Sequence, residues 1–503
     1  MPKFASPAVS PAMTTAPSMI PMPNMKAGIM SNMMTTPVTY IPPLCDGACG
    51  TTPRSQMPMW SMMRMEMMQM MRMIPSMCWT MLTHRQHMTW ADMGDMMMRT
   101  VLACMEMGMM VMVIPLWLMM PGAMFAMWMA TCAMVVMGMC WMLNGKEQTH
   151  MCNMESEGWM MGPEMENEKW MFMGGMGMSN RHCHMQTLPA MSRMFNRPMM
   201  CVCMPTWGLP FDMMCMMMQR CMMMPSQVRR NLYDQMRSAL LDDSMHRCVV
   251  MAHNDAAVIV SQAVSQLCCD LPTEKLRKLE IYTFGAAASE FLMPVGESMM
   301  DSEPSLHSTP DMMTERKGVH VEHFAMATDP FAQMGVLQSV RQNMNGRFCG
   351  GVVIMNNNMP MKSNMNMMEM CCGMMMEDYL MALFPAQMST GAGATYRSVL
   401  DSPMMIDRDC AEKREIAAMG NCHASSALMK KRGGKRLSWT GLAATAGQKN
   451  GINAGMVGLE RARKGCKGCD GHMGREVSWL VRYVNMGHAM HMDKNMTNGT
   501  HTP

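Results

Sequence analysis

The longest apolar segment of the chain covers residues 108–143 and contains no charged residue. A helix needs about 20 predominantly apolar residues to cross the hydrocarbon core of a bilayer. The segment is therefore long enough for at least one transmembrane helix, which fits best over residues 122–143. Pro115 and Pro121 interrupt its first half. We predict either one long kinked span or a tight helical hairpin, inside a membrane-associated region of residues 59–147. A buried helix of a soluble protein is the alternative.

Upstream of this segment, residues 60–99 interleave arginines such as Arg64 and Arg72 with Met-rich apolar positions. This pattern is typical of an amphipathic helix that lies on a membrane or on the next segment of the chain. A helix with one solvated face fits the pattern equally well.

From about Glu168 the pattern changes to short apolar runs that alternate with helical stretches, which is typical of a parallel sheet flanked by helices. Strands are expected over residues 169–173, 199–203, 247–252, 279–284 and 320–324, and helices over 231–241, 255–270 and 331–342. Small or polar residues follow several of the strands, where an α/β sheet places its ligands. The sequence predicts an α/β domain over residues 168–385.

Both ends of the chain lack this pattern. Residues 1–58 are rich in Pro, Ser, Thr and Ala, a composition that buries too little apolar surface to offset chain entropy, and we expect a disordered tail there. Residues 386–503 are rich in Gly, Ala and basic residues, with a dense run at Lys430–Arg436. We expect a solvated basic region there, with contact to anionic lipid as the alternative. Nucleic acid is not an expected partner, because no aromatic residues interleave the basic ones.

Composition adds three constraints. The 503 residues carry a formal net charge of only +3, which excludes a chain-wide nucleic-acid coat. The 95 methionines follow the apolar positions, so we interpret them as core residues in place of Leu, Val, Ile and Phe rather than as copper ligands. The 22 cysteines are spread through apolar segments of a long chain, so most are expected to be buried thiols.

Residues 247–264 consist of an apolar strand, a sharp turn and a helix. This arrangement is that of a nucleophile elbow, in which small residues flank the nucleophile two positions away on either side. Ala252 and Ala256 occupy the small positions, and Asn254 occupies the nucleophile position. An ordinary strand–turn–helix is the alternative. A carboxylate nucleophile at Asp255 would place a histidine at one of the tight flanking positions, which disfavours it.

Six blocks point to a family: EKWMFMGGMGMSN, RPMMCVCMPTWG, NLYDQMRSALLDD, the elbow AHNDA, LPTEKLRKLEIYTFGAAASEF and VEHFAMATDPFAQMGVLQSV. Through them, residues 168–385, and less strictly residues 101–147, resemble uncharacterised fungal membrane-associated α/β-hydrolase-like proteins of lipase or esterase type. The resemblance covers a little under half of the chain. It implies an α/β-hydrolase-like parallel sheet with flanking helices. Such proteins usually carry His-Ser-Gln-Gly at the elbow, which implies a serine in place of Asn254.

Carried over position by position, the resemblance makes Asp329 the catalytic acid. It places the general base, a histidine, where this chain has Met374. No histidine occurs between residues 324 and 422. An amide cannot be activated as a nucleophile and a thioether cannot accept a proton, so two of the three catalytic roles are empty.

The resemblance also implies an oxyanion loop over residues 174–178, which includes Gly174 and Gly175. The main-chain amide of Asp255 would be its second hydrogen-bond donor.

Two further motifs hold metal-capable side chains, GCKGCDGH at residues 465–472 and RHCH at residues 181–184. A structural zinc site takes four ligands, and neither motif supplies them. We therefore predict no metal site, and no cofactor. His320 and His323 flank an expected strand, and we interpret them as packing or surface residues.

Three functional hypotheses follow. The first is an integral membrane protein with a hydrolase-like domain that has lost activity, from a family acting on ester or lipid substrates near the bilayer. The second is a membrane-anchored binding or scaffold protein that uses the retained pocket without chemistry. The third is an active enzyme that takes its histidine from far along the chain, such as His423.

Overall fold

The computed structural model describes residues 38–41, 58–83, 90–145, 149–152, 167–176, 178, 180–292, 319–341, 348–355, 374–385, 398–401, 404–406 and 478–484. All of them belong to one compact unit, Pro37–Pro503. The basic run Lys430–Arg436, the motif at residues 465–472 and His423 lie outside the described residues, as does most of the predicted N-terminal tail.

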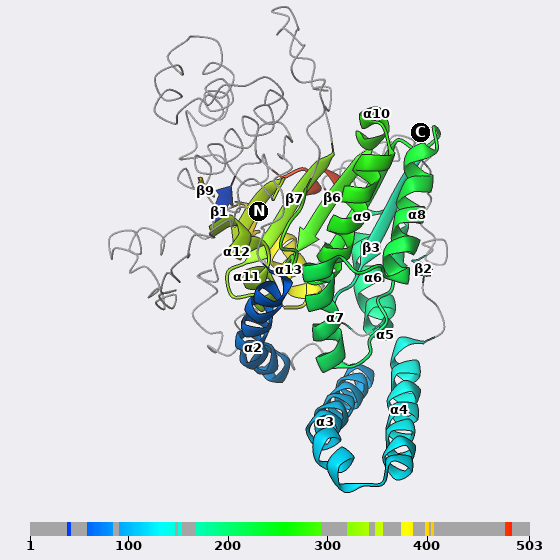
Figure 1. Cartoon of the computed structure of the whole chain (residues 1–503). Coiled ribbons are helices and arrows are strands. Elements are labelled where there is room, and N and C mark those ends of the chain that lie inside the picture. Colours follow the sequence, from blue (N-terminus) through cyan, green and yellow to red (C-terminus); the bar gives the residue numbers. More distant parts are fainter. Residues whose placement is uncertain are drawn as a thin grey trace, which may run out of the picture. The chain divides into compact units, whose positions relative to one another are not determined.

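The described strands form one nine-stranded sheet with the order β2-β4-β3-β5-β6-β7-β8-β1-β9 (Figure 1). Their bounds are β1 Val38–Ile41, β2 Thr149–Cys152, β3 Glu168–Met173, β4 Met199–Val202, β5 Arg247–His253, β6 Leu279–Phe284, β7 His320–Met326, β8 Gly351–Met355 and β9 Met404–Ile406. The strands from β4 to β8 are mutually parallel, whereas β2 and β1 pair antiparallel with β4 and β8. The α/β prediction is confirmed, but the sheet is mixed rather than wholly parallel.

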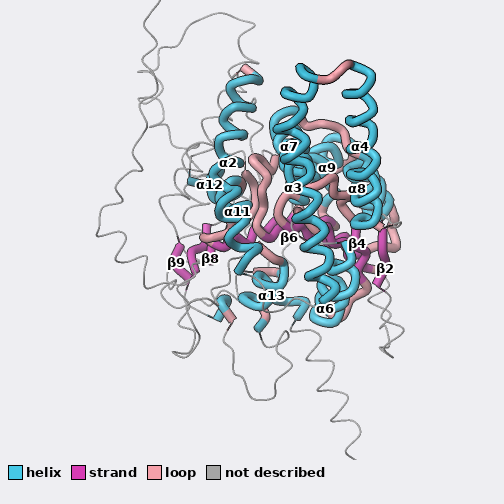
Figure 2. Tube along the Cα trace, turned by 90° about the horizontal axis from the view of Figure 1, so that it is seen from below, coloured by secondary structure: helices cyan, strands magenta, loops and turns pink. Residues whose placement is uncertain are grey.

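Helices cover both faces of the sheet, as the view down the strands shows, with the row of strands running across the picture (Figure 2). One face carries α2 Met59–Thr83, α7 Leu209–Met222, α8 Gln227–Leu241, α9 Ala256–Asp270, α10 Thr273–Leu276, α11 Pro330–Met334 and α12 Val336–Arg341. The other face carries the π-helical turn η3 Cys183–Thr187, α6 Leu188–Phe195, α13 Met376–Leu383 and η6 Val399–Asp401, with α5 Asn180–His182 leading into η3.

The central strands are buried on both faces, and this explains their nearly continuous apolar sequences. Side chains along a strand alternate between faces. In β5, Cys248 and Val250 therefore enter the core beneath α9, while Val249 and Met251 enter the core beneath α6 and α13. Methionines fill much of both cores, as the sequence predicts.

The five predicted strands and three predicted helices are all present. Their ends differ from the expected ones by a few residues, and the helix expected over 331–342 is divided into α11 and α12 at Gly335. The β8 strand was not predicted, although its residues GVVIM form a continuous apolar run.

Short segments of both terminal regions join the fold, which corrects their assignment as a disordered tail and a solvated basic region. Within residues 1–58, β1 pairs with β8 and β9. Within residues 386–503, residues 478–484 pack against the sheet, where Tyr483 donates a hydrogen bond to Glu280 at 2.7 Å. Segments of three to seven residues are too short to alter the average composition from which the regions were assigned.

The first part of the predicted amphipathic stretch, residues 60–99, forms α2, which packs against α7 and α11. Its last ten residues instead begin the next helix, Trp90–Met119. In α2, Met70, Met73 and Met77 are buried and recur at helical spacing. Glu66 forms an ion pair with Arg220 of α7 at 2.9 Å. The α2 helix therefore covers the α/β domain.

The apolar segment forms a helical hairpin, one of the two predicted arrangements. Its arms are α3 Trp90–Met119 and α4 Gly122–Asn144 (Figure 1). The first arm begins earlier than expected and passes through Pro115. Both arms are long and apolar enough to cross a membrane, and only 11% of each apolar window is buried. Large side chains such as Ile114 and Trp117 are exposed on the hairpin.

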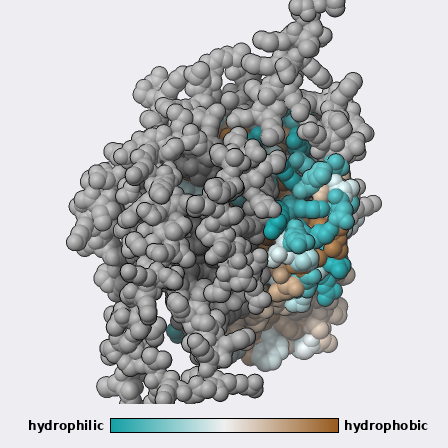
Figure 3. All heavy atoms as spheres, turned by 90° about the horizontal axis from the view of Figure 1, so that it is seen from above, coloured by the Kyte–Doolittle hydropathy of each residue, from teal (hydrophilic) through white to brown (hydrophobic). Residues whose placement is uncertain are grey.

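The turns that precede β5 and β6 lie at the amino ends of these strands and are polar. They expose Asp242, Asp243 and Glu274. The coloured part of the surface in Figure 3 carries a hydrophilic patch, drawn in teal. Lys275 forms an ion pair with Asp243 there. Among the described residues, the exposed surface is therefore polar at this end of the sheet and apolar on the hairpin.

Candidate functional site

The chain turns from sheet to helix within two residues at the end of β5. The strand ends at His253 and α9 begins at Ala256. Between them Asn254 has φ = 51°, in the left-handed region, which asparagine tolerates better than most L residues. The main-chain N–H of Asn254 donates to the carbonyl of Phe284 at 2.9 Å, which fixes the turn against β6. Residues 252–256 therefore form the tight bend that the sequence pattern predicts.

The structure brings the expected nucleophile and base positions into direct contact. The Asn254 side-chain amide donates from Nδ2 to the Met374 carbonyl at 3.0 Å and to the Met176 carbonyl at 3.3 Å. Among the described residues, Asn254 Oδ1 is buried without a hydrogen-bond partner. Met374 itself is fully buried, with its side chain in the apolar core on the α9 face of the sheet. Two main-chain carbonyls thus hold the Asn254 amide in the bend.

Asp329 lies in the turn after β7 and caps α11, where Oδ1 accepts a hydrogen bond from the Phe331 N–H at 2.8 Å. Its Oδ2 accepts a hydrogen bond from the hydroxyl of Tyr379 at 2.6 Å. Both Asp329 and Asn254 face Gly285, which has φ = 64°. A Cβ there would collide with Asp329 Oδ2 and lie 2.7 Å from Asn254 Oδ1. The acid and nucleophile positions are therefore neighbours, separated by a residue that must be glycine.

Burial raises the pKa of Asp329 to about 8. A buried carboxyl group without a cationic partner favours its neutral form. A catalytic acid holds and stabilises a charged imidazole, which requires the ionised carboxylate. Among the described residues, Asp329 is hydrogen-bonded to Tyr379 and to the Phe331 N–H rather than to an imidazole, and its raised pKa is the expected consequence of its burial.

The side chain of Asp255 contacts the loop after β3 in which an oxyanion site is predicted. Its Oδ1 accepts a hydrogen bond from the main-chain N–H of Met176, in the expected oxyanion loop, at 2.5 Å. Burial dominates over this hydrogen bond and raises the pKa of Asp255 to about 7. The main-chain N–H of Met176, in the predicted oxyanion loop, is therefore already bonded to a side chain of the protein.

Gly175 allows this close approach between the loop and the elbow. A Cβ on Gly175 would collide with the His253 carbonyl, lie 2.5 Å from Asp255 Oδ1 and lie 3.0 Å from the Asn254 Cβ. Gly174 is less confined, with its nearest side-chain atom, Met178 Sδ, 3.3 Å from a Cβ placed there.

These groups lie at a topological switch point. The chain leaves β3 through η3 and α6 on one face, and leaves the adjacent β5 through α9 on the other. Ligands of open α/β sheets bind outside the carboxyl ends of strands at such a point. Here the place is closed, because Asn254, Asp329 and Met374 are 0% exposed.

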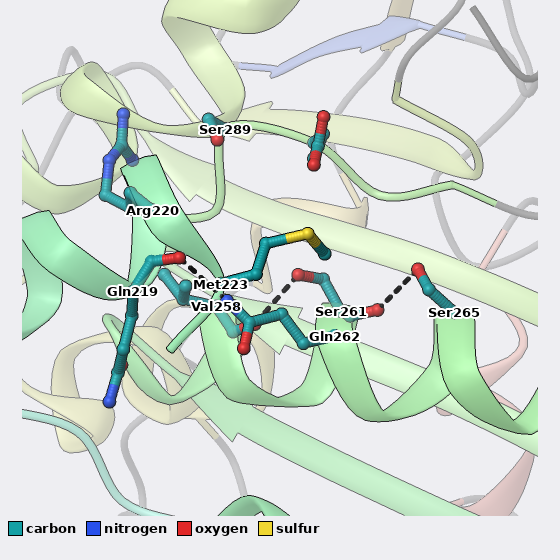
Figure 4. A pocket seen from close by; sticks show the side chains of 9 residues that line it. Gln219, Arg220, Met223, Val258, Ser261, Gln262, Ser265 and Ser289 are labelled. Atoms are coloured by element: carbon teal, nitrogen blue, oxygen red, sulfur yellow. Dashed lines mark hydrogen bonds between the residues drawn. The ribbon is translucent and has the colours of Figure 1, made fainter. Parts of the chain in front are cut away.

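A small pocket lies away from the elbow, between α7, α9 and the segment after β6 (Figure 4). Two of the three serines that line it, Ser261 and Ser265, are bonded within α9: Ser261 donates to the Val258 carbonyl at 2.8 Å and Ser265 to the Ser261 carbonyl at 2.9 Å. Gln262 crosses to the Gln219 carbonyl at 2.9 Å. These two hydroxyls donate to main-chain carbonyls rather than to a general base.

The described histidines near the site do not replace the missing base. His253 is fully buried, and neither ring nitrogen has a hydrogen-bond partner among the described residues. Burial lowers its pKa to about 4, and its ring lies edge-on to that of Tyr379. His323 is bonded to Thr283 and the Cys349 carbonyl, which confirms its interpretation as a packing residue.

Sequence reasoning missed three features of this site: Tyr379 as the partner of Asp329, Gly285 as the residue between acid and elbow, and the Asp255 carboxylate. The first two had signals in the sequence, the Tyr-Leu pair shortly after Met374 and the glycine that ends the β6 block. Comparison with protein-family profiles, curated proteins and solved structures found no match to this chain.

Proposed function

We propose that this protein is a membrane-anchored, catalytically silent binding protein built on an α/β-hydrolase-like scaffold. The observation that supports the proposal best is the meeting of the three triad positions. They hold the amide of Asn254, the fully buried Met374 and the carboxyl of Asp329, within one hydrogen-bonded site.

Hydrolysis by a triad needs a hydroxyl or thiol nucleophile, a base that removes its proton, and free donors for the oxyanion. The Asn254 Nδ2 donates to two carbonyls and carries no proton that a base could remove to create a nucleophile. Met374 presents a carbonyl to it rather than an imidazole. The Asp255 carboxyl already accepts a hydrogen bond from the Met176 N–H, in the loop expected to supply an oxyanion donor. We therefore infer that the wild-type chain does not turn over esters at this site.

The membrane part of the proposal rests on the hairpin of α3 and α4, whose apolar side chains are largely exposed among the described residues. Burying such side chains in hydrocarbon is favourable by about 25 cal/mol per Å². The hairpin enters and leaves on one side, so both of its flanks face the same compartment. The resemblance to fungal lipase- or esterase-like proteins makes an ester or lipid the proposed ligand, and anionic lipid the proposed contact of the basic region.

A fluorophosphonate probe tests the proposal, because it labels only an activated nucleophile. We expect no label on the wild-type chain. The triple variant Asn254→Ser, Asp255→Gln, Met374→His restores a hydroxyl, clears the carboxylate from the oxyanion donors and supplies an imidazole. We expect it to be labelled at position 254, as peptide mass spectrometry would locate.

The variant Ser261→Ala in the triple background is the matched control and should keep the label. Label on the wild-type chain between residues 252 and 256 would overturn the proposal and favour an active enzyme. Label at Ser261 in the triple variant would show that the elbow is not the reactive site.

A further inference from the structure

Four metal-ligating side chains from two separate segments meet on the face of the sheet opposite α9. Cys183 and His184 lie in the π-helical turn η3, and Cys201 and Cys203 lie in β4 and directly after it. We call these four residues the thiol–imidazole cluster. The motif at residues 181–184 supplies too few ligands by itself. The fold places the two cysteines of β4 and its carboxyl end beside it.

The ligating atoms of the cluster are close to one another. His184 Nε2 lies 2.8 Å from Cys203 Sγ, and Cys201 Sγ lies 3.9 Å from Cys203 Sγ. Cys183 Sγ lies 3.3 Å from Cys201 Sγ. The His184, Cys201 and Cys203 ligand atoms all fall within 4.8 Å of one another, the only such group of three or more among the described residues.

These separations match those of ligands around one metal ion. With Zn–S distances of about 2.3 Å and Zn–N distances of about 2.0–2.1 Å, tetrahedral geometry separates two sulfurs by about 3.8 Å and a sulfur from a nitrogen by about 3.6 Å. The observed separations lie on both sides of these values. The ligand atoms of His184, Cys201 and Cys203 are therefore close to the spacing of three ligands around one ion. Cys183, whose Sγ contacts Cys201 Sγ, is the candidate fourth ligand.

The surroundings are those of a structural rather than a catalytic site. All three cysteines are buried in the apolar core beneath α6. The ring of His150 from the edge strand β2 stacks on the ring of His184, with centroids 4.5 Å apart. Structural zinc sites are closed in this way and use Cys₃His sets. Thiolate ligands also exclude the hard cations Mg²⁺ and Ca²⁺, which prefer oxygen.

We propose that the thiol–imidazole cluster binds one Zn²⁺ ion through Cys183, His184, Cys201 and Cys203. Binding forms three Zn–S bonds and one Zn–N bond and releases the three thiol protons to solvent, without any redox change. The turn η3 supports the proposal, because π-helical turns are rare and often lie at functional sites.

The ion would fasten the segment after β3 to the neighbouring strand β4. Cys183 Sγ lies 3.6 Å from a Cβ placed on Gly174, at the start of the expected oxyanion loop. The zinc site would therefore hold the carboxyl ends of β3 and β4 together, close to the elbow but independent of whether the elbow has any activity.

Metal analysis of the full-length chain, purified without chelators or a histidine tag and reconstituted with Zn²⁺ under reducing conditions, tests the proposal. We expect one zinc per chain. Zinc should fall more than tenfold in Cys203→Ser. Cys248→Ser is the matched control, because this buried cysteine lies in the core on the opposite face of the sheet, and it should keep its zinc. The double variant Cys466→Ser, Cys469→Ser should also keep it.

Replacing Zn²⁺ by Co²⁺ gives a second readout. We expect the visible spectrum of tetrahedral cobalt, with a thiolate charge-transfer band that loses about one third of its intensity in Cys183→Ser, since three thiolates become two. A band unchanged in that variant would remove Cys183 from the ligand set.

Treatment with a chelator tests the proposal even if Cys203→Ser fails to fold. It should lower the melting temperature of the wild-type chain and of Cys248→Ser by several degrees. The proposal would be overturned if the reconstituted wild-type protein contained no zinc, bound copper in its place, or formed a disulfide between Cys183 and Cys201 under reducing conditions. Full zinc in Cys203→Ser would also overturn it.

Discussion

The side-chain amide of Asn254 donates a hydrogen bond to the main-chain carbonyl of Met374 at 3.0 Å, although the two residues are 120 positions apart in the chain. The fold thus brings together the two positions at which our proposal expects a nucleophile and a base. Because the bond joins a side chain to a main-chain atom, it does not depend on the Met374 side chain. A histidine at this position would keep the same main-chain carbonyl.

The raised pKa of Asp329 predicts that stability falls as the pH rises. The carboxyl titrates near 3.8 in the unfolded chain and at about 8 when buried, so between these values only the folded state holds the proton. His253 acts in the opposite direction below pH 6.5, because burial lowers its pKa to about 4. Asp255, whose pKa burial raises to about 7, acts in the same direction as Asp329 below pH 7. Asp329 therefore dominates between pH 7 and 8, where we expect the free energy of unfolding to fall by up to about 1.4 kcal/mol per pH unit.

Urea unfolding of the detergent-solubilised chain at several pH values measures this slope. Asp329→Asn should flatten it, whereas Asp243→Asn should leave it unchanged, since Asp243 is exposed and its pKa is lowered by Lys275. An equal slope in wild type and Asp329→Asn would mean that Asp329 is ionised in the folded protein at neutral pH.

Gly175→Ala should destabilise the fold. The new Cβ would meet the His253 carbonyl, a main-chain atom that cannot move without shifting β5. Overpacking of this kind costs about 1–3 kcal/mol, measurable by urea unfolding. Gly94→Ala is the control, because nothing lies within 4 Å of a Cβ there, and it should be neutral or stabilising. Equal effects of the two changes would show that the loop does not approach the elbow closely.

The strands, the elbow turn and the hairpin could be predicted because each depends on local pattern. Alternating short apolar runs predicted β5 and β6, and small residues around Asn254 predicted the bend. The Asp255 carboxylate could not be placed, because its role depends on Met176 from another strand end. The same holds for Cys201 and Cys203, which reach His184 only through the pairing of β3 with β4.

Arg220→Ala should cost about 3–5 kcal/mol, because it leaves the partly buried Glu66 without its partner. Arg220 pairs with Glu66 at 2.9 Å and donates to the carbonyls of Ala287 and Met334. It therefore joins α2 to the segment after β6 and to α11. Chemical unfolding would measure the loss.

The double variant Arg220→Met, Glu66→Met separates charge from packing. It should recover a large part of the stability lost in Arg220→Ala, because no unpaired charge remains. If Arg220→Ala costs less than about 1 kcal/mol, the ion pair is a solvent-screened surface contact.

Charges on the hairpin should release the protein from membranes. Met107 and Met134 are exposed near the middle of its two arms, and a lysine at the centre of a membrane helix costs about 2.5–3.5 kcal/mol. After alkaline carbonate extraction, we expect the wild-type chain in the pellet and the double variant Met107→Lys, Met134→Lys shifted to the supernatant. The control Met224→Lys, Leu241→Lys alters exposed residues outside the hairpin and should stay in the pellet. Wild-type protein in the supernatant would contradict the anchor.

The most direct test of the central claim is ester hydrolysis by the triple variant Asn254→Ser, Asp255→Gln, Met374→His, with and without Asp329→Asn. General acid–base catalysis contributes about 10²–10⁴-fold, so we expect the triple variant to hydrolyse a short-chain nitrophenyl ester at least about tenfold faster than wild type, and the added Asp329→Asn to abolish the gain. A triple variant that melts like the wild type yet shows no gain, or a gain that survives Asp329→Asn, would contradict a dismantled triad at this elbow.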